Sequence, residues 1–278
     1  MRILIATDLT ARSDRALARA FALAQEMRSA LSVVHIVDED LPDELKDHTV
    51  EWAERRLSAE ISELSAAAGV VASIETCVGC AQRDIPKLAQ SSMTDIIVVG
   101  LPDILSNTTF TKSTAGAILR ANSKPLLIVK CKVVAPYKAA LVGTDFSSKS
   151  RAALRAAVSV APHSYFSLVH AYHIPFQAFL GSPAFRKQYA DELQLEFDSF
   201  LATETDSLEP QMRTGRINRV LEEGEPAGVI RRTCDRSGIE LVAIGAPRNA
   251  DLLSFIWESP VVGLVNQPPC DLLVVGPS

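Results

Sequence analysis

The sequence has few aromatic residues, no excess of basic charge and no long apolar run, and each absence argues against a class of protein. Aromatics make up 6% of the 278 residues and apolar residues 47%, so we expect an interior built mainly from Ala, Val, Leu and Ile. The net charge is −5 without a Lys/Arg-rich run, which argues against a nucleic-acid or anionic-membrane surface. No apolar stretch approaches the ~18 residues that span a bilayer, and the N-terminal run ending at Asp8 is too short for a signal peptide.

Cysteine is scarce as well. Five cysteines, an odd number, do not make a disulfide framework, so we expect a reducing, cytoplasmic compartment. Cys77 and Cys80 form a CxxC pair before a predicted short helix, where a thiol pKa can be lowered. One such pair does not complete a zinc site, so chance thiols are favoured over a redox or metal role. Cys131, Cys234 and Cys270 have no partner in the sequence pattern.

The chain does contain a large internal repeat. Residues 3–8 and 140–145 are short apolar runs that end in Thr-Asp. Residues 95–100 and 240–245 each begin with an acidic residue, continue as an apolar run and end in Gly. A repeat of this length indicates a duplicated domain, since a solenoid repeat is far shorter.

Strands and helices alternate in the same order in both halves, which indicates βαβ units and a parallel sheet covered on both faces. The predicted strands are residues 3–6, 31–37, 71–78, 96–99 and 126–129, then 140–143, 166–170, 216–222, 241–244 and 272–275. The predicted helices are residues 13–27, 43–68, 85–90, 113–121, 148–160, 185–205 and 227–234. We therefore predict an α/β protein of two similar five-stranded domains, residues 1–132 and 138–278, joined by a linker that contains Pro136.

Two carboxylates occupy equivalent positions at predicted strand ends. Asp8 and Asp145 follow the first strand of each half. Ligands of open α/β sheets lie at the carboxyl ends of the strands, near the point where the strand order reverses. A carboxylate there can accept hydrogen bonds from a ribose or an adenine amine. A turn or helix-start aspartate without a ligand is an equally good interpretation of position alone.

Familiar catalytic motifs are missing. The sequence has no Walker A motif, Rossmann glycine triplet, nucleophile elbow or metalloprotease motif. His35 and His170 lie inside predicted buried strands and have no neighbouring ligand pattern. A hydrogen-bonded core histidine is therefore favoured over an acid–base or metal role.

Five landmarks recur in both halves: a strand ending in Thr-Asp, a Ser-rich helix start, a strand carrying His35 or His170, a glycine (Gly79 or Gly224) before a short helix, and an apolar run ending in Gly. In these landmarks nearly the whole chain resembles the universal stress protein family, twice over. The resemblance to a tandem member implies five-stranded parallel sheets that pair through their last strands, so the two domains would pack as an internal pseudo-dimer. It also implies ATP binding in many members, though not in all.

The ATP-binding members carry a pattern that resembles Gly-x2-Gly-x9-Gly-Ser/Thr after the fourth strand. Its glycines let backbone N–H groups approach phosphates, and its last residues begin a helix whose dipole favours anions. The first half has, at these positions, Gly100, Asp103, Ser113 and Thr114. The second half has Gly245, Arg248, Glu258 and Ser259. Both halves therefore keep the spacing and lose most of the glycines.

These replacements change the charge beside a bound phosphate. Asp103 and Glu258 repel a polyphosphate, whereas Arg248 and Lys112 are charged donors to one. For a bound nucleotide the resemblance implies contacts with Asp8, Ile36, Gly100, Ser113 and Thr114 in the first half. The implied second-half counterparts are Asp145, Ala171, Gly245, Arg248 and Ser259. The pattern disfavours ordinary ATP binding in the second half and leaves the first half open.

Two apolar segments of the second half, residues 174–181 and 252–257, stand where loops are expected. Packing against the sheet edge or the other domain is favoured over a hydrophobic pocket or a partner surface.

The leading functional prediction is a non-catalytic stress-response or signalling protein with degenerate nucleotide sites. The alternative is an adenine-nucleotide switch that holds ATP, with Mg²⁺, mainly in the first domain; a slow ATPase is less favoured because no residue stands out as a base for water. Intramolecular domain pairing is expected, and the apolar edges allow a further homodimer. No metal site, nucleic acid or membrane is expected. The sequence names neither the stress, the pathway nor a protein partner.

Overall fold

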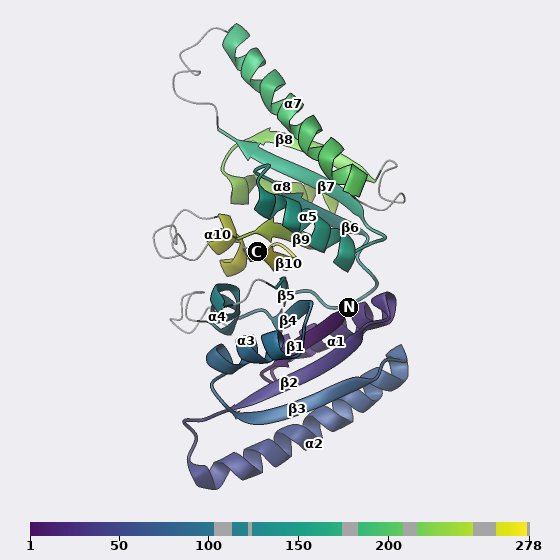
Figure 1. The fold of residues 1–278 in the computed structure, drawn as a ribbon, viewed down its shortest axis with the longest axis vertical. Coiled ribbons are helices and arrows are strands. Elements are labelled where there is room, and N and C mark those ends of the chain that lie inside the picture. The colour runs from purple at the N-terminus through teal and green to yellow at the C-terminus, as the bar shows by residue number, and fades with distance from the viewer. Residues whose placement is uncertain (103–112, 122–123, 174–182, 208–215, 247–259, 277–278) are drawn as a thin grey trace.

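In a computed structural model of the chain, the strands of both halves form one ten-stranded sheet (Figure 1). The structure describes residues 1–102, 113–121, 124–173, 183–207, 216–246 and 260–276. The strand order is β3-β2-β1-β4-β5-β10-β9-β6-β7-β8. Neighbouring strands are parallel except at the centre, where β5 and β10 run antiparallel.

The first half supplies one edge of the sheet and the second half the other. The strands of the first half are β1 (Arg2–Thr7), β2 (Ala30–Asp38), β3 (Ala72–Gly79), β4 (Ile96–Gly100) and β5 (Leu126–Val129). Its helices are α1 (Ala11–Met27), α2 (Asp43–Ala68), α3 (Ala81–Ser91) and α4 (Thr114–Ala121). The strands of the second half are β6 (Ala139–Gly143), β7 (Tyr165–Tyr172), β8 (Ile217–Glu223), β9 (Leu241–Gly245) and β10 (Asp271–Val275). Its helices are α5 (Ser148–Val160), α7 (Pro183–Ser207), α8 (Pro226–Ser237) and α10 (Pro260–Asn266).

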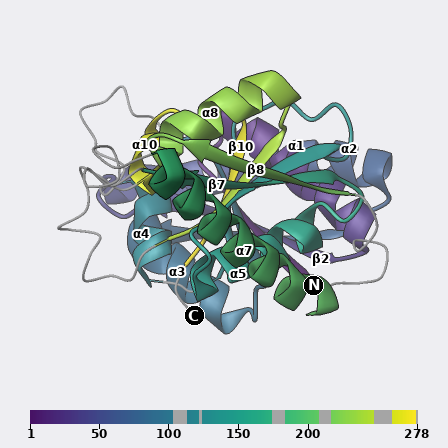
Figure 2. The same cartoon turned by 90° about the horizontal axis from the view of Figure 1, so that it is seen from above.

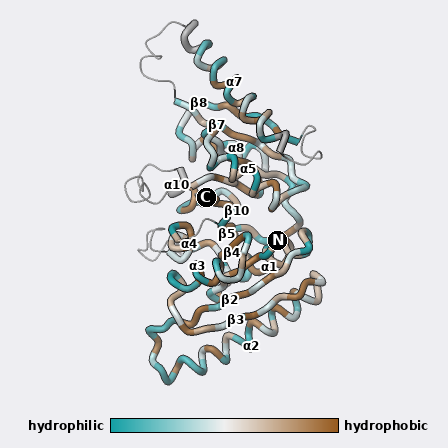
Figure 3. Tube along the Cα trace, viewed as in Figure 1, coloured by the Kyte–Doolittle hydropathy of each residue, from teal (hydrophilic) through white to brown (hydrophobic). Residues whose placement is uncertain are grey.

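The helices cover both faces of the sheet, which gives a three-layer structure (Figures 1 and 2). One apolar core forms where α1, α2, α5 and α7 pack on one face, and a second where α3, α4, α8 and α10 pack on the other. The central strands are buried on both sides, which explains their continuous apolar sequences and the brown stretches along the sheet in Figure 3. Within the described residues, no helix is long and apolar enough to cross a membrane.

The two halves meet as an internal pseudo-dimer, as predicted. Leu273 pairs with Leu127 and Leu272 with Ile128 across the antiparallel junction. The last strand of each half therefore pairs with the last strand of the other, and a pseudo-two-fold axis passes through the Leu127–Leu273 pair.

Most predicted elements are confirmed, and the differences have local causes. The predicted bounds of α2 and α5 match the structure, and Gly69 ends α2 in the left-handed conformation with φ 65°. The prediction for α3 was wrong at its start, because the helix begins at Ala81 rather than residue 85. Its first turn is closed by Asp84, whose carboxylate accepts the amide of Cys80 at 2.9 Å.

Two further differences concern the second half. Helix α10 (Pro260–Asn266) was not predicted, since its short Pro-Val-Val-Gly start lacks an amphipathic period. Helix α7 begins at Pro183 rather than residue 185. The apolar segments 174–181 and 252–257 lie outside the described residues.

The glycines that end β4 and β9 are required by close packing. A Cβ on Gly100 would stand 3.0 Å from the backbone carbon of Arg12, and one on Gly245 would stand 2.8 Å from that of Lys149. Each strand end thus touches the first turn of α1 or α5, and this contact brings the helix start to the edge of the sheet.

We expect Gly245→Ala to lower the free energy of unfolding by about 1–3 kcal/mol, because the added methyl group overlaps backbone that cannot rotate away. Gly263→Ala is the matched control. Gly263 lies inside helix α10, and a Cβ at this position would stand 3.6 Å from the Cβ of Ala227, an ordinary contact distance. We therefore expect Gly263→Ala to be neutral or stabilising by up to about 1 kcal/mol. Urea unfolding of both variants tests this, and equal stability of the two would contradict it.

Candidate functional site

A cleft lies at the carboxyl ends of β1 and β4, where the strand order of the first half reverses. Its volume is about 460 Å³, within the range of small-molecule sites. All five first-half residues implied by the family resemblance line it: Asp8, Ile36, Gly100, Ser113 and Thr114. The fold therefore brings these separate parts of the sequence together in one place.

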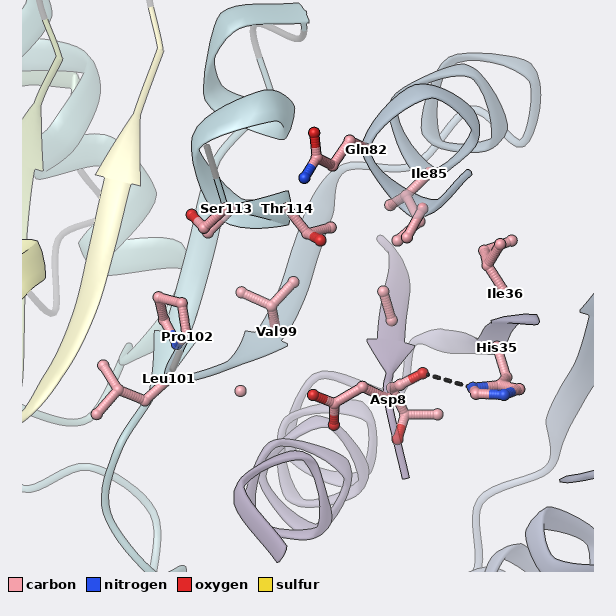
Figure 4. Close-up of a pocket in the computed structure, with 15 residues that line it drawn as sticks. Asp8, His35, Ile36, Gln82, Ile85, Val99, Leu101, Pro102, Ser113 and Thr114 are labelled. Carbon is pink, nitrogen blue, oxygen red and sulfur yellow. Dashed lines mark hydrogen bonds between the residues drawn. The ribbon is translucent and has the colours of Figure 1, made fainter. Parts of the chain in front are cut away.

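The cleft has apolar walls and polar ends. Ile36, Ile85 and Val99 form apolar wall, and Figure 4 shows Asp8 on one side with Ser113 and Thr114 across from it. Among the described residues that line the cleft, Asp8 is the one with a formal charge. A ligand with a flat apolar part and polar groups at its ends matches this arrangement.

The Asp8 carboxylate closes the start of α1 with one oxygen. Its Oδ1 accepts the Thr10 amide at 3.0 Å, the Thr10 hydroxyl at 2.6 Å and the Ser13 hydroxyl at 2.5 Å. Within the described residues, Oδ2 accepts no hydrogen bond, and it remains available to a donor in the cleft. Partial burial raises the pKa of Asp8, but the hydrogen bonds from Ser13 and Thr10 outweigh it, and the pKa lies below its usual value. The carboxylate is therefore ionised at neutral pH.

The opposite side of the cleft is the N-terminus of α4. The Ser113 hydroxyl accepts the Gly116 amide at 3.1 Å, and the Ser113 carbonyl accepts the Ala117 amide at 2.9 Å. The amides of Thr114 and Ala115 belong to the first turn, where no intrahelical acceptor exists. With the Thr114 hydroxyl they form a set of donors at the positive end of a helix dipole.

Both histidines are hydrogen-bonded, as predicted; His35 is buried and His170 is partly buried. His35 Nδ1 lies 2.9 Å from the Thr7 carbonyl oxygen, and His170 Nδ1 lies 2.8 Å from that of Thr144. Each joins a second strand of its half to the end of the first, next to the aspartate. His35 also lines the cleft, so it holds the Thr7–Asp8 turn in position.

Gln82 was missed by the sequence analysis. It lies in the first turn of α3, lines the cleft and is drawn in Figure 4 close to Ser113 and Thr114. The early start of α3 explains the omission, because a helix from residue 85 leaves Gln82 in a loop. The glycine before the helix, Gly79, was the signal that marks a tight strand-to-helix turn at this point. The corresponding residue of α8 is Ala227, which is buried.

The second half keeps the turn at its first strand. Asp145 Oδ1 accepts the Ser147 amide at 3.1 Å and the Ser147 hydroxyl at 2.5 Å, which repeats the Asp8 arrangement. Ala171 lies in β7 and Gly245 ends β9. The other predicted residues of this half, Arg248, Glu258 and Ser259, lie outside the described residues, as do Asp103 and Lys112 of the first half.

The CxxC pair does not have the geometry of a disulfide. Cys77 lies in β3 and Cys80 has an extended backbone, with φ −107° and ψ 112°. Three extended residues separate Cα atoms by about 10 Å, beyond the ~7 Å limit for a disulfide. Burial, Glu75 and Asp84 raise the pKa of Cys77, which lowers its thiolate fraction. Within the described residues, no group of three or more His, Cys, Asp or Glu is arranged to hold a metal ion.

The sequence profile of the universal stress protein family matches residues 1–130 and again residues 136–276. The chain belongs to the universal stress protein family. No curated protein matches the sequence.

Solved structures show the same fold over the whole chain. A universal stress protein from Archaeoglobus fulgidus has a TM-score of 0.73 at 16% identity, covering 99% of this chain and 98% of its own. A functionally unknown protein from Pseudomonas aeruginosa has a TM-score of 0.66 at 18% identity, covering 99% of this chain and 92% of its own. Both likenesses concern the fold, which this universal stress protein shares with each structure over nearly the whole length of both chains.

We predict that Asp8→Asn weakens the protein in a pH-dependent manner. Asparagine keeps an acceptor for the Thr10 amide but loses the charge, so we expect a loss of about 1 kcal/mol in unfolding free energy at pH 7. Because the folded pKa of Asp8 is depressed, its stabilisation is present above the ordinary pKa of about 4 and is lost as the pH falls.

Urea unfolding of wild type and Asp8→Asn at pH 7 and near pH 3 measures this. The difference between the two proteins should shrink at the lower pH. An undiminished difference near pH 3 would show that the charge of Asp8 contributes nothing at the start of α1.

Proposed function

We propose that this universal stress protein is a non-catalytic stress-response protein that binds one adenine nucleotide in the cleft of its first half. We place the two domains at residues 1–132 and 138–278, with the second acting as the structural partner of the first. The observation that carries the proposal is the convergence of Asp8, Ile36, Gly100, Ser113 and Thr114 on one cleft.

The cleft offers a suitable contact for each part of such a ligand. The uncommitted Oδ2 of Asp8 is an acceptor for a ribose hydroxyl or an adenine amine. Apolar side chains such as Ile36 and Ile85 suit the faces of a base. The Thr114 and Ala115 amides at the start of α4 suit a phosphate oxygen.

Charge limits the affinity for a triphosphate. Asp8 is anionic, and the described residues that line the cleft include no Lys or Arg. Asp103, in the residues between Pro102 and Ser113, adds a further negative charge in sequence. We therefore propose weak binding that depends on Mg²⁺ to neutralise the phosphates. A non-catalytic role agrees with this cleft, where Asp8 is already engaged with α1.

The second candidate function is a stress-response protein that binds no nucleotide at all. It is favoured because two of the landmark residues have a structural role that needs no ligand. Asp8 Oδ1 closes the turn before α1, and Gly100 is required by contact with Arg12 and Ser13. Both residues would be needed in a protein with an empty cleft. This candidate keeps the cytoplasmic, signalling role and assigns recognition to an unidentified protein partner.

Titration calorimetry with ATP, AMP, cyclic AMP and adenosine, each with and without Mg²⁺, tests the proposal. We expect one ligand per chain. Asp8→Ala should weaken binding by about 10- to 100-fold, the effect of losing one hydrogen bond to a charged group. Asp145→Ala is the matched control. It removes the equivalent hydrogen bonds to Ser147 in the second half and should change affinity less than twofold.

Native mass spectrometry of the same proteins counts the ligands bound. Absence of binding at millimolar concentrations of all four ligands would establish the second candidate. Equal losses in Asp8→Ala and Asp145→Ala would place the ligand elsewhere.

A further inference from the structure

The pseudo-two-fold axis at the centre of the sheet relates two sites that have become chemically different. The axis passes through the paired residues Leu127 and Leu273. On one side α1 faces the start of β10; on the other α5 faces the start of β5. If the contact between the two halves were symmetric, the same residues would stand at both places.

On the α1 side, Asp271 is a buried carboxylate with several donors. It is fully buried, and its Oδ1 accepts the amides of Lys130 and Cys131, each at 2.8 Å. Its Oδ2 accepts the Tyr137 hydroxyl at 2.7 Å and lies 3.4 Å from Arg19 Nε. The carboxylate of the second half is therefore bound by groups from the first half and the linker.

Arg19 is buried as well. Its side chain comes from α1, and its guanidinium lies 4.0 Å from the centre of the Tyr137 ring. Its Nη1 donates to the Ala135 carbonyl at 3.1 Å. Arg19, Tyr137 and Asp271 together form what we call the Arg19–Asp271 socket. A buried pair of this kind is destabilising when either partner is removed, because the other charge is left without compensation.

On the α5 side the equivalent residues carry no charge. By the repeat, Ala156 takes the place of Arg19 and Pro125 the place of Asp271. Both line a hollow of about 340 Å³, together with Ile96 and Val160. Asp95 lines the hollow as well, but it is exposed and accepts the Arg2 amide at 2.7 Å. One side of the axis is thus filled by a buried ion pair, and the other is an open hollow without one.

This asymmetry distinguishes between possible pairings of the sheet edges. Two copies of the first half paired through β5 would bury two Arg19 side chains, each facing a Pro125. Two copies of the second half paired through β10 would bury two Asp271 carboxylates, each facing an Ala156. Both like-with-like pairings bury unpaired charges, whereas pairing of unlike halves unites arginine with aspartate.

We propose that the Arg19–Asp271 socket is a specificity determinant of this interaction surface. It makes the β5 edge accept a β10 edge and reject a second β5 edge, so the partner that the surface fits is a second half, which the linker supplies from the same chain. The surface therefore does not serve pairing with like halves of a second copy. This role of the β5–β10 contact is independent of nucleotide binding.

The test places a reporter on the axis of the full-length chain. Leu127→Cys and Leu273→Cys are introduced together. Directly opposed residues of an antiparallel pair have Cα atoms about 4.5–5.5 Å apart, which suits a disulfide. A disulfide between positions 127 and 273 then reports pairing of a first half with a second half, which we call unlike pairing. A disulfide between two chains that joins 127 to 127, or 273 to 273, reports pairing of identical halves, which we call like pairing. Peptide mapping by mass spectrometry separates these products after refolding in a glutathione redox buffer.

The reporter chain is compared with one that also carries Arg19→Ala and Asp271→Ala, which makes both sides of the axis uncharged. The linker holds the two halves at an effective concentration on the order of millimolar. At a protein concentration of about 200 µM, we therefore expect roughly a tenth of the disulfides at positions 127 and 273 to join identical halves once the socket is removed. With the socket intact the like-paired share should be at least tenfold lower.

Two controls keep the result decisive. The wild-type chain without the new cysteines gives the background from the native thiols. If the double alanine chain does not refold, judged by circular dichroism, Arg19→Gln with Asp271→Asn replaces it, and a smaller rise in like pairs is expected. An unchanged like-paired share in a folded variant would overturn the proposal and leave the linker as the cause of unlike pairing. Abundant like pairs in the intact socket would overturn it as well.

Discussion

The antiparallel contact between β5 and β10 is the constraint on which the rest of the structure depends. A parallel sheet of five strands leaves the last strand of each half with unpaired backbone groups along one side. Joining the two last strands satisfies these groups and extends the two cores across the junction on both faces of the sheet. The linker needs only to return the chain to the start of β6, next to β9, so a short segment suffices.

Within this shared frame the halves have diverged in how they use their helices. In the second half, α7 packs an aromatic group on the sheet, where the Phe146 ring stacks on His170 with centroids 4.3 Å apart and meets Phe197 edge-on. Glu204 of the same helix is fully buried and is bound by Arg151 and Arg155 of α5. In the first half, the residue equivalent to Phe146 is Leu9. The first half keeps Gln82 at its cleft where the second half has Ala227, so the polar cleft residues and the aromatic packing belong to different halves.

The sequence was sufficient for the fold wherever local pattern and tertiary packing agree. Continuous apolar runs predicted the central strands, and the predicted helices 43–68 and 148–160 match α2 and α5. The pattern failed where a single hydrogen bond at a helix start, or the burial of a short helix, decides the outcome. Asp84 begins α3 early by binding the Cys80 amide, and α10 is held by burial of Leu264 and Val265.

The same distinction applies to the site. The family resemblance implied which residues would lie together, and they line one cleft because the ends of parallel strands meet at one edge of a sheet. The resemblance did not predict the reason for the glycine at the end of the fourth strand, which is contact with α1. Nor did it indicate the Arg19–Asp271 socket. Asp271 is part of an ordinary apolar strand in sequence, and its donors come from the other half and the linker.

Helix α1 connects the cleft with the contact between the two halves. Near its start Ser13 donates to Asp8, and further along Arg15 and Arg19 donate to the carbonyls of Lys130 and Ala135. A packed helix moves as a rigid element, so its position is set at both ends. The second half contacts this helix through Asp271 beside Arg19, and the cleft contacts it through the hydrogen bond of Ser13 to Asp8. The same helix therefore lies against the second half near its middle and against the cleft of the first half at its start.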